Sequence, residues 1–205
     1  MDFRHDQSRQ GVRQTSLNLF LGDSIEATEL EGPGLRFALW FSGCSLRCPG
    51  CCNPHLFSKS AGSPTSGRDI IAMIEKAQLN KGIEGVSYLG GEPFEQPEIL
   101  EYLVLNTRAL GLTNMVYTGF EIEQIRTHPH GSQILSQVDL LVDGPYLQEK
   151  RSTKRRFIGS TNQTLHFLSS AYHREDPSFS ESNRLEIRYR SSEVHIHGFP
   201  AFPRI

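Results

Sequence analysis

A strongly apolar segment, Leu35–Ser42 (LRFALWFS), runs directly into a loop that holds all four cysteines of the chain. The density of bulky apolar side chains predicts a short strand buried on both faces. In the loop, Cys44, Cys48 and Cys51 have the spacing C-x3-C-x2-C, and Cys52 follows directly. We therefore expect a metal-binding loop at the end of a core strand.

The cysteine spacing favours an iron–sulfur cluster with one open corner. Structural zinc sites close a tetrahedron with four ligands, usually in two separated pairs, and this sequence has no second pair. Three thiolates can hold three corners of a four-iron cluster and leave one iron for a ligand that is not protein. A closed cluster with Cys52 as fourth ligand, a zinc site and a chance arrangement are the alternatives.

Length and composition predict one globular domain, 1–205, with a core of about 17–168 and a C-terminal extension, 169–205. The chain has 205 residues, 37% of them hydrophobic, and a formal net charge of −2. This charge gives no reason to expect nucleic acid or an anionic membrane as a partner. The polar N-terminus and the lack of an apolar run of about 20 residues predict a cytoplasmic protein outside the membrane.

Strand and helix patterns alternate along the chain. This alternation predicts an α/β fold with right-handed crossovers and a parallel sheet, open or closed into a barrel. After the cysteine loop, 62–67 is expected to be a loop. The other expected strands are 17–21 at an edge, 86–89, 114–118, 138–142 and 164–168, the helices are 68–78, 97–111, 121–126 and 132–137, and 185–197 is a terminal hairpin.

Residues suited to ligand binding recur directly after the predicted core strands. In parallel sheets, ligands bind beyond the carboxyl ends of the strands, so these residues are expected to share one site. They are the cysteines, then Gly90, Gly91, Glu92 and Pro93, then Thr118, and finally Asp143.

With these motifs in place, the chain resembles the radical S-adenosylmethionine (SAM) enzymes, above all the activating enzymes of glycyl-radical proteins such as anaerobic ribonucleotide reductase. The resemblance spans roughly Glu31–Leu168 and rests on EGPGLRFALWFSGCSLRCPGCCNP, YLGGEPFEQP, VYTGF, LLVDGPY and GSTNQ. It implies a shortened, open (β/α) partial barrel with a C-terminal β-like extension. It also implies a [4Fe-4S] cluster on Cys44, Cys48 and Cys51, whose fourth iron is chelated by SAM.

The resemblance also implies roles for residues around the cluster. Gly90–Pro93 would bind the amino group of SAM, with Gly91 and Glu92 as the best candidates; an ordinary strand-to-helix turn is the alternative. Gly50 and Cys52 would place their backbones near the cluster and the adenine. Cys52 stands where the family commonly has an aromatic residue, so a bystander thiol is the other interpretation.

Two later strand ends and one late motif complete the candidate site. Thr118 and Asp143 would contact the SAM ribose or carboxylate or face the target glycine, with a turn or capping role as the alternative. The GSTNQ string, Gly159–Gln163, resembles a family segment that begins with arginine, whereas Ile158 stands at that place here.

The implied partners are a large glycyl-radical protein, above all a ribonucleotide reductase, and a flavodoxin- or ferredoxin-type electron donor. One alternative is a radical SAM enzyme for a peptide, nucleotide or small molecule, and another is a non-catalytic iron–sulfur electron-transfer module. His195 and His197 are expected at the surface. A basic run could dock an acidic partner or form a solvated loop, and it comprises Lys150, Arg151, Lys154, Arg155 and Arg156.

Overall fold

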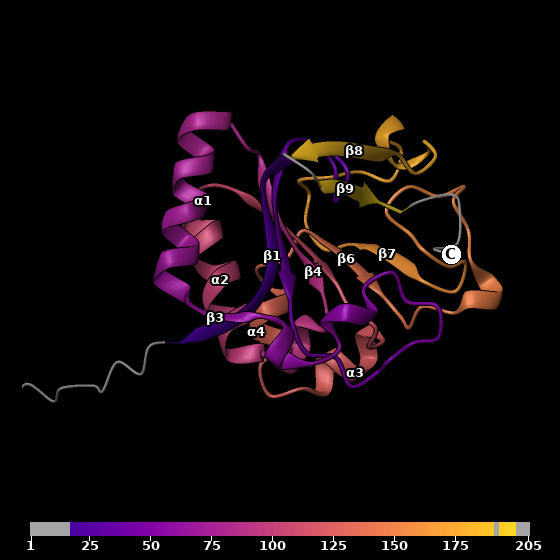
Figure 1. Ribbon diagram of the computed structural model, residues 1–205, viewed down its shortest axis with the longest axis horizontal. Coiled ribbons are helices and arrows are strands. Elements are labelled where there is room, and N and C mark those ends of the chain that lie inside the picture. Colours follow the sequence, from indigo (N-terminus) through magenta and orange to yellow (C-terminus); the bar gives the residue numbers. More distant parts are fainter. Residues whose placement is uncertain (1–16, 191–192, 200–205) are drawn as a thin grey trace, which may run out of the picture.

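The computed structural model describes residues 17–190 and 193–199. Its centre is a seven-stranded open sheet in the order β3-β1-β2-β4-β5-β6-β7, and a separate hairpin pairs β8 with β9 (Figure 1). The strands are β1 (Asn18–Thr28), β2 (Arg36–Phe41), β3 (Ser63–Ser66), β4 (Gly85–Gly90), β5 (Thr113–Tyr117), β6 (Leu140–Asp143), β7 (Thr164–Phe167), β8 (Leu185–Arg190) and β9 (Glu193–Gly198). The helices are α1 (Gly67–Lys81), α2 (Pro97–Ala109), α3 (Ile122–Thr127) and α4 (Gly131–Leu135).

The four middle strands confirm the predicted parallel sheet, because β2, β4, β5 and β6 pair in parallel. The outer strands differ: β1 is antiparallel to β2 and β3, and β7 is antiparallel to β6. The described residues 144–163 between β6 and β7 contain only a short 3-10 turn, Gln148–Lys150, so no helix carries the chain back for a parallel return. The result is a mixed α/β sheet with a parallel centre.

Two expectations for the N-terminal edge are wrong. The segment expected as an edge strand at 17–21 is the start of the longer β1, which pairs on both sides. The segment 62–67, expected as a loop, contains the edge strand β3. Serine and proline are weak strand formers and only Thr65 favours a strand, so β3 depends on its pairing with β1, in which Pro64 lies opposite Phe20 at an edge that tolerates proline.

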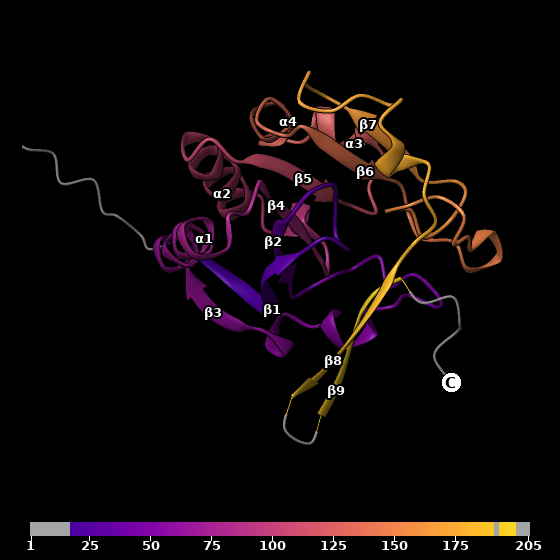
Figure 2. The same cartoon turned by 90° about the horizontal axis from the view of Figure 1, so that it is seen from above.

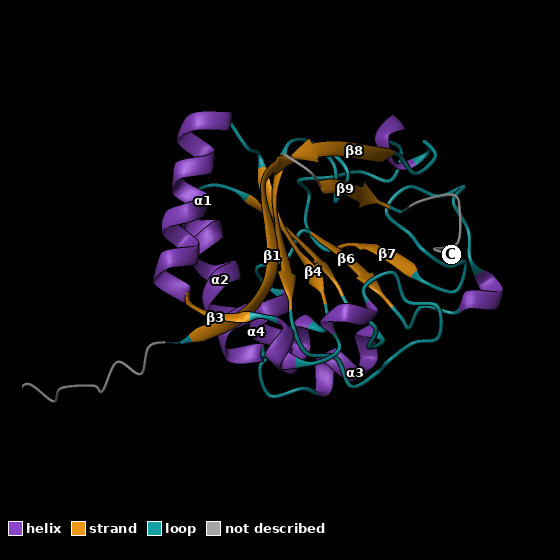
Figure 3. Cartoon of the chain, viewed as in Figure 1, coloured by secondary structure: helices purple, strands orange, loops and turns teal. Residues whose placement is uncertain are grey.

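The two faces of the sheet carry different layers. Phe37, Leu39 and Phe41 of β2 belong to the main core with buried residues of α1 and α2. Ala38 and Trp40, which alternate with them, pack on the opposite face. Figure 3 shows the helices on one side of the sheet and the C-terminal hairpin on the other.

The C-terminal extension covers the face of the sheet that carries no helices. Phe179 lies against Phe157, Phe167 and Tyr172, with ring centroids 5.0 Å apart for Phe167 and Phe179. These rings pack on Met115 and neighbouring buried residues of β5 and β6. The chain then forms the predicted hairpin, which stands apart from the sheet in Figure 2.

Candidate metal and cofactor site

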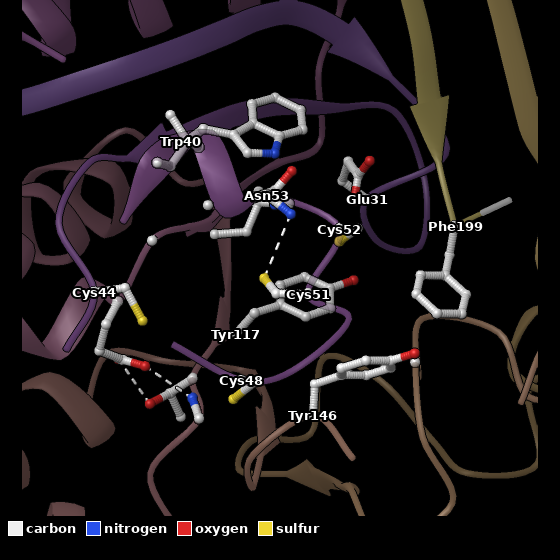
Figure 4. A pocket seen from close by; sticks show the side chains of 18 of the residues that line it. Glu31, Trp40, Cys44, Cys48, Cys51, Cys52, Asn53, Tyr117, Tyr146 and Phe199 are labelled. Carbon is white, nitrogen blue, oxygen red and sulfur yellow. Dashed lines mark hydrogen bonds between the residues drawn. The ribbon is translucent and has the colours of Figure 1, made fainter. Parts of the chain in front are cut away.

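A cavity of about 430 Å³ lies at the carboxyl ends of the parallel strands. Figure 4 shows the cysteine loop on one side of it and Tyr146 and Phe199 on the other. The predicted site residues that line it are Cys44, Cys48, Cys51, Cys52, Gly90, Gly91, Glu92 and Thr118. The expected convergence of the strand ends on one site is therefore present.

The cysteine loop is held by backbone hydrogen bonds at its start. Gly43 N donates to Leu56 O at 2.8 Å, and Cys44 N donates to Phe57 O at 3.0 Å. The Ser45 N–H donates to the Glu95 carboxylate at 2.6 Å. These contacts fix where the loop leaves β2, so the thiols enter the cavity from a defined direction.

The donor chemistry fits an iron–sulfur cluster. All four cysteines are half-buried, and none forms a disulfide. Burial raises the pKa of the Cys44 thiol, and the charges of Glu92 and Glu95 raise it further, so the metal-free site favours the protonated thiol. No three His, Cys, Asp or Glu side chains in the described part of the chain are grouped closely enough for a single ion. Three thiolates that each bind a different iron of a cluster do not need to converge on one metal ion.

Gly90 and Gly91 allow β4 to approach the start of the cysteine loop. A Cβ on Gly91 would lie 2.3 Å from the carbonyl oxygen of Gly43, and Gly90 has a left-handed φ of 107°. The N–H groups of Gly91 and Glu92 donate to Phe41 O and Gly43 O at 2.7 and 2.8 Å. Because these donors are used within the protein, the segment can offer a ligand its carbonyl oxygens and the Glu92 carboxylate.

Glu92 ties the end of β4 to the end of β5. Its buried carboxylate accepts hydrogen bonds from Phe94 N at 3.0 Å, Thr118 Oγ1 at 2.8 Å and Gly119 N at 2.8 Å. Burial raises the pKa of Glu92 to about 7, and these three hydrogen bonds oppose that shift. Thr118 thus fixes the carboxylate as well as lining the cavity.

Three predicted site residues are not among the described residues that line the cavity: Gly50, Pro93 and Asp143. Gly50 has a φ of 70°, and a Cβ there would lie 2.7 Å from Gln148 Oε1, so it packs against the turn after β6. Pro93 is buried in the 3-10 turn Pro93–Glu95. Their cofactor contacts stay predictions.

Asp143 makes a contact of the kind given as its alternative, at the start of α3, and its contact with SAM or the target glycine stays a prediction. Its carboxylate accepts from Ile122 N, at the start of α3, at 2.8 Å. The other carboxylate oxygen lies 3.1 Å from His166 Nε2. Val142 packs against the helix-free face of the sheet, and side chains alternate along a strand, so Asp143 points toward the helix side. Its backbone neighbour Gly144 lines the cavity instead.

The cavity is also lined by residues that the sequence analysis missed or expected at the surface. They are Glu31, Trp40, Tyr117, Tyr146, His197 and Phe199. Burial raises the pKa of Glu31 to about 7, and the Gly198 N–H lowers it. His197 was expected at the surface, yet its ring lies 6.3 Å from that of Trp40; the side chain of His195 lies outside the described part. No local motif marks these residues as a group, because they come from distant segments of the chain.

The GSTNQ string organises the turn that carries Tyr146. Gln163 Oε1 accepts from Gly159 N and Ser160 N at 3.0 and 3.1 Å, and Gln163 Nε2 donates to Gly144 O at 3.0 Å. The motif therefore holds the loop after β6 next to the cavity.

The basic run divides into a structural residue and exposed ones. Arg156 is buried, lies 3.1 Å from Glu181 and donates to Glu29 O at 2.9 Å. Lys150, Lys154 and Arg155 are exposed.

None of the helices within the described ranges has both the length and the apolar character that a membrane span requires.

Comparison with known proteins identifies the family of this chain. A model described as a 4Fe-4S single cluster domain matches residues 30–166. The anaerobic ribonucleoside-triphosphate reductase-activating protein of Escherichia coli K12 is 31% identical over 147 residues, which cover 68% of this chain and 92% of the relative. The proteins of that name from Salmonella typhi and phage T4 are 29% and 27% identical, with 92% and 86% of their lengths covered. The chain therefore belongs to the 4Fe-4S single cluster family of the radical SAM type, to which these activating proteins are related.

Proposed function

We propose that this protein is a radical SAM activase that installs a glycyl radical in an anaerobic ribonucleotide reductase or a similar partner. The observation that carries the proposal is the presence, in one cavity, of three cysteine thiols and the acceptor-rich end of β4. Relatives that are named reductase-activating proteins support the choice of partner. Cys44, Cys48 and Cys51 would hold a [4Fe-4S] cluster, whose remaining iron would be left for SAM.

The chain's own residues bind and orient the cofactors. The carbonyl oxygens of Gly90 and Gly91 and the carboxylate of Glu92 would hold the SAM ammonium group. Thr118 holds that carboxylate in place. Cys52, which lines the cavity, and the neighbouring Gly50 would place their backbones near the adenine, and Cys52 would not be a ligand. Bound there, the cluster and SAM would supply one-electron reductive chemistry that can remove a hydrogen atom from a partner.

The open seven-stranded sheet is best described as a shortened partial barrel of the radical SAM type with a C-terminal β extension. We treat 1–205 as one radical SAM domain located in the cytoplasm. A flavodoxin- or ferredoxin-type protein would deliver the electron.

The test begins with anaerobic cluster reconstitution. EPR spectra of the reduced cluster with and without SAM should differ, and 5′-deoxyadenosine should form with dithionite. A glycyl-radical doublet should then appear in the co-encoded partner. Cys48→Ser is the matched control and should give none of these signals. If SAM did not change the EPR spectrum of the cluster and was not cleaved, the protein would be an electron-transfer module instead.

A second candidate is a radical SAM enzyme with a different substrate. The observation that favours it is the C-terminal wall, because residues beyond the matched stretch 30–166 line the cavity. SAM cleavage without a glycyl doublet in any co-encoded candidate would support this alternative.

A further inference from the structure

Residues beyond the stretch that the family model matches form part of the cavity wall. The model match ends at 166, whereas Asn183, Arg184, His197, Gly198 and Phe199 line the cavity. They come from the base of the β8–β9 hairpin, where the chain enters β8 and leaves β9. In Figure 4, Phe199 lies across the cavity from Cys44. The extension therefore contributes directly to the space that the cofactors would share with a substrate.

Phe199 is held in this position by the loops after β6. Its ring lies 6.2 Å from that of Tyr146 in an edge-to-face arrangement, and the Arg151 guanidinium lies 4.3 Å above it. A Cβ on Gly159 would lie 3.4 Å from the ring, so the Gly159 backbone borders Phe199 as well. Because the GSTNQ turn fixes both Gly159 and the loop of Tyr146, it supports the Phe199 ring as well.

The hairpin base is also anchored to the loop between β1 and β2 and to the basic loop. The Gly198 N–H donates to the Glu31 carboxylate, and the His197 ring lies near Trp40. Asn183 Oδ1 accepts from Phe157 N at 2.9 Å, and Asn183 Nδ2 donates to Ile158 O at 3.2 Å. Contacts on two sides make the hairpin base a fixed wall.

We propose that Phe199 and the hairpin base select substrates by size, so that only a narrow segment reaches the cofactor. A suitable segment is an extended polypeptide with glycine at the reacting position. The proposal rests on the proposed function. Its physical basis is that the rings of Phe199 and Tyr146 fill the side opposite the cysteines, where a bulky side chain at the reacting position would collide with them.

The first experiment uses the full-length protein without a cluster, so it does not depend on SAM chemistry. The probes are iodoacetamide and the much larger fluorescein maleimide, and peptide mapping gives the alkylation rate at each cysteine. Phe199→Ala should raise the rate of the bulky probe relative to the small one by about tenfold, the scale of shape discrimination in an apolar pocket. Ile187→Ala, an exposed position farther along the same hairpin, is the matched control and should leave the ratio unchanged.

The second experiment uses reconstituted protein with SAM and dithionite but without a partner. Fully deuterated methanol and cyclohexanol serve as a small and a bulky hydrogen donor, and mass spectrometry measures deuterium in 5′-deoxyadenosine. The deuterium atom moves from the alcohol carbon to the 5′ carbon, and dithionite and a proton reduce the remaining alcohol radical. Phe199→Ala should increase deuterium from the bulky donor relative to methanol by about tenfold.

The two experiments separate the possible failures. Absence of 5′-deoxyadenosine from the wild type would overturn the proposed function. The alkylation ratio would still test whether Phe199 restricts access to the cavity. An unchanged bulky-to-small alkylation ratio in Phe199→Ala would overturn the size-selecting wall, whatever the result with SAM.

Discussion

Among single residues, the four cysteines of the loop should differ in their importance for the cluster. Adjacent residues reach two corners of one small cluster only with difficulty, so Cys52 should be dispensable. Serine at Cys44, Cys48 or Cys51 should lower iron and sulfide content after reconstitution by at least about tenfold, because loss of a ligand costs no less than loss of its supporting contacts. Cys52→Ser should retain most of the cluster, and a loss as large as that of Cys48→Ser would identify Cys52 as a ligand.

Glu31 should make stability depend on pH. Burial raises its pKa from 4.5 to about 7, so the folded protein retains a proton that the unfolded chain has released. Its contribution to stability is therefore complete below about pH 4.5 and decreases as pH rises toward about 7. Glutamine cannot ionise, and its amide oxygen can still accept the Gly198 N–H.

We expect Glu31→Gln to be more stable than the wild type by about 1–3 kcal/mol near pH 8, with a smaller difference near pH 5. Urea denaturation at both pH values measures this, and the exposed Glu175→Gln is the control. A stability difference between Glu31→Gln and the wild type that does not change with pH would contradict a raised pKa of Glu31 in the folded protein.

Residue positions near the site were predictable where a local pattern determines them. The cysteine spacing and the glycines after β4 are such patterns, and these residues line the cavity. Asp143 shows the limit, since one residue along a strand reverses the side-chain direction. Glu31 and Phe199 could not be found, because their places in the wall depend on contacts between distant segments.

At the scale of elements, the junction between β4 and the cysteine loop should tolerate no side chain at Gly91. A Cβ there would lie 2.3 Å from the Gly43 carbonyl oxygen, which is backbone and cannot move alone. Gly91→Ala should therefore lower the free energy of unfolding by about 1–3 kcal/mol and reduce cluster incorporation.

Gly82→Ala separates this steric effect from backbone strain. Gly82 has a φ of 67°, but a Cβ there meets nothing within 4 Å. This control should cost about 1 kcal/mol and leave cluster incorporation unchanged. Equal losses of cluster in Gly91→Ala and Gly82→Ala would show that the close approach of Gly91 to the Gly43 carbonyl is not needed for cluster incorporation.

The types of the elements were predictable where the apolar pattern was clear. This pattern is a continuous run in β2 and a helical period in α1 and α2. The pairing of the outer strands was not, because antiparallel β1 and β7 depend on where the chain turns rather than on local pattern. The strand β3 was missed because its residues become a strand only beside β1.

Across the whole molecule, the extension and the core share one buried network. Arg36 is fully buried near the start of β2, and its guanidinium donates to Ser87, Thr113 and backbone carbonyls. Tyr172, from the extension, completes this set, with its hydroxyl 2.9 Å from Arg36 Nη1 and 2.8 Å from Thr113 Oγ1. A buried guanidinium needs all its donors satisfied, so the core depends on the extension as well as supporting it.

This dependence predicts that residues 17–199 unfold in one cooperative step, with the extension unable to detach first. Tyr172→Phe removes the hydroxyl partner of Arg36 and should lower the free energy of unfolding by about 1–3 kcal/mol, the cost of a hydrogen bond to a charged group. Tyr102→Phe, on the helix side of the sheet, should change it far less. Urea denaturation followed by far-UV circular dichroism, with hydrogen exchange resolved by peptide, measures both quantities. If 169–190 exchanged much faster than the sheet in the wild type, and Tyr172→Phe left the main transition unchanged, the extension would be a separately unfolding layer, because its contact with Arg36 would not be transmitted to the core.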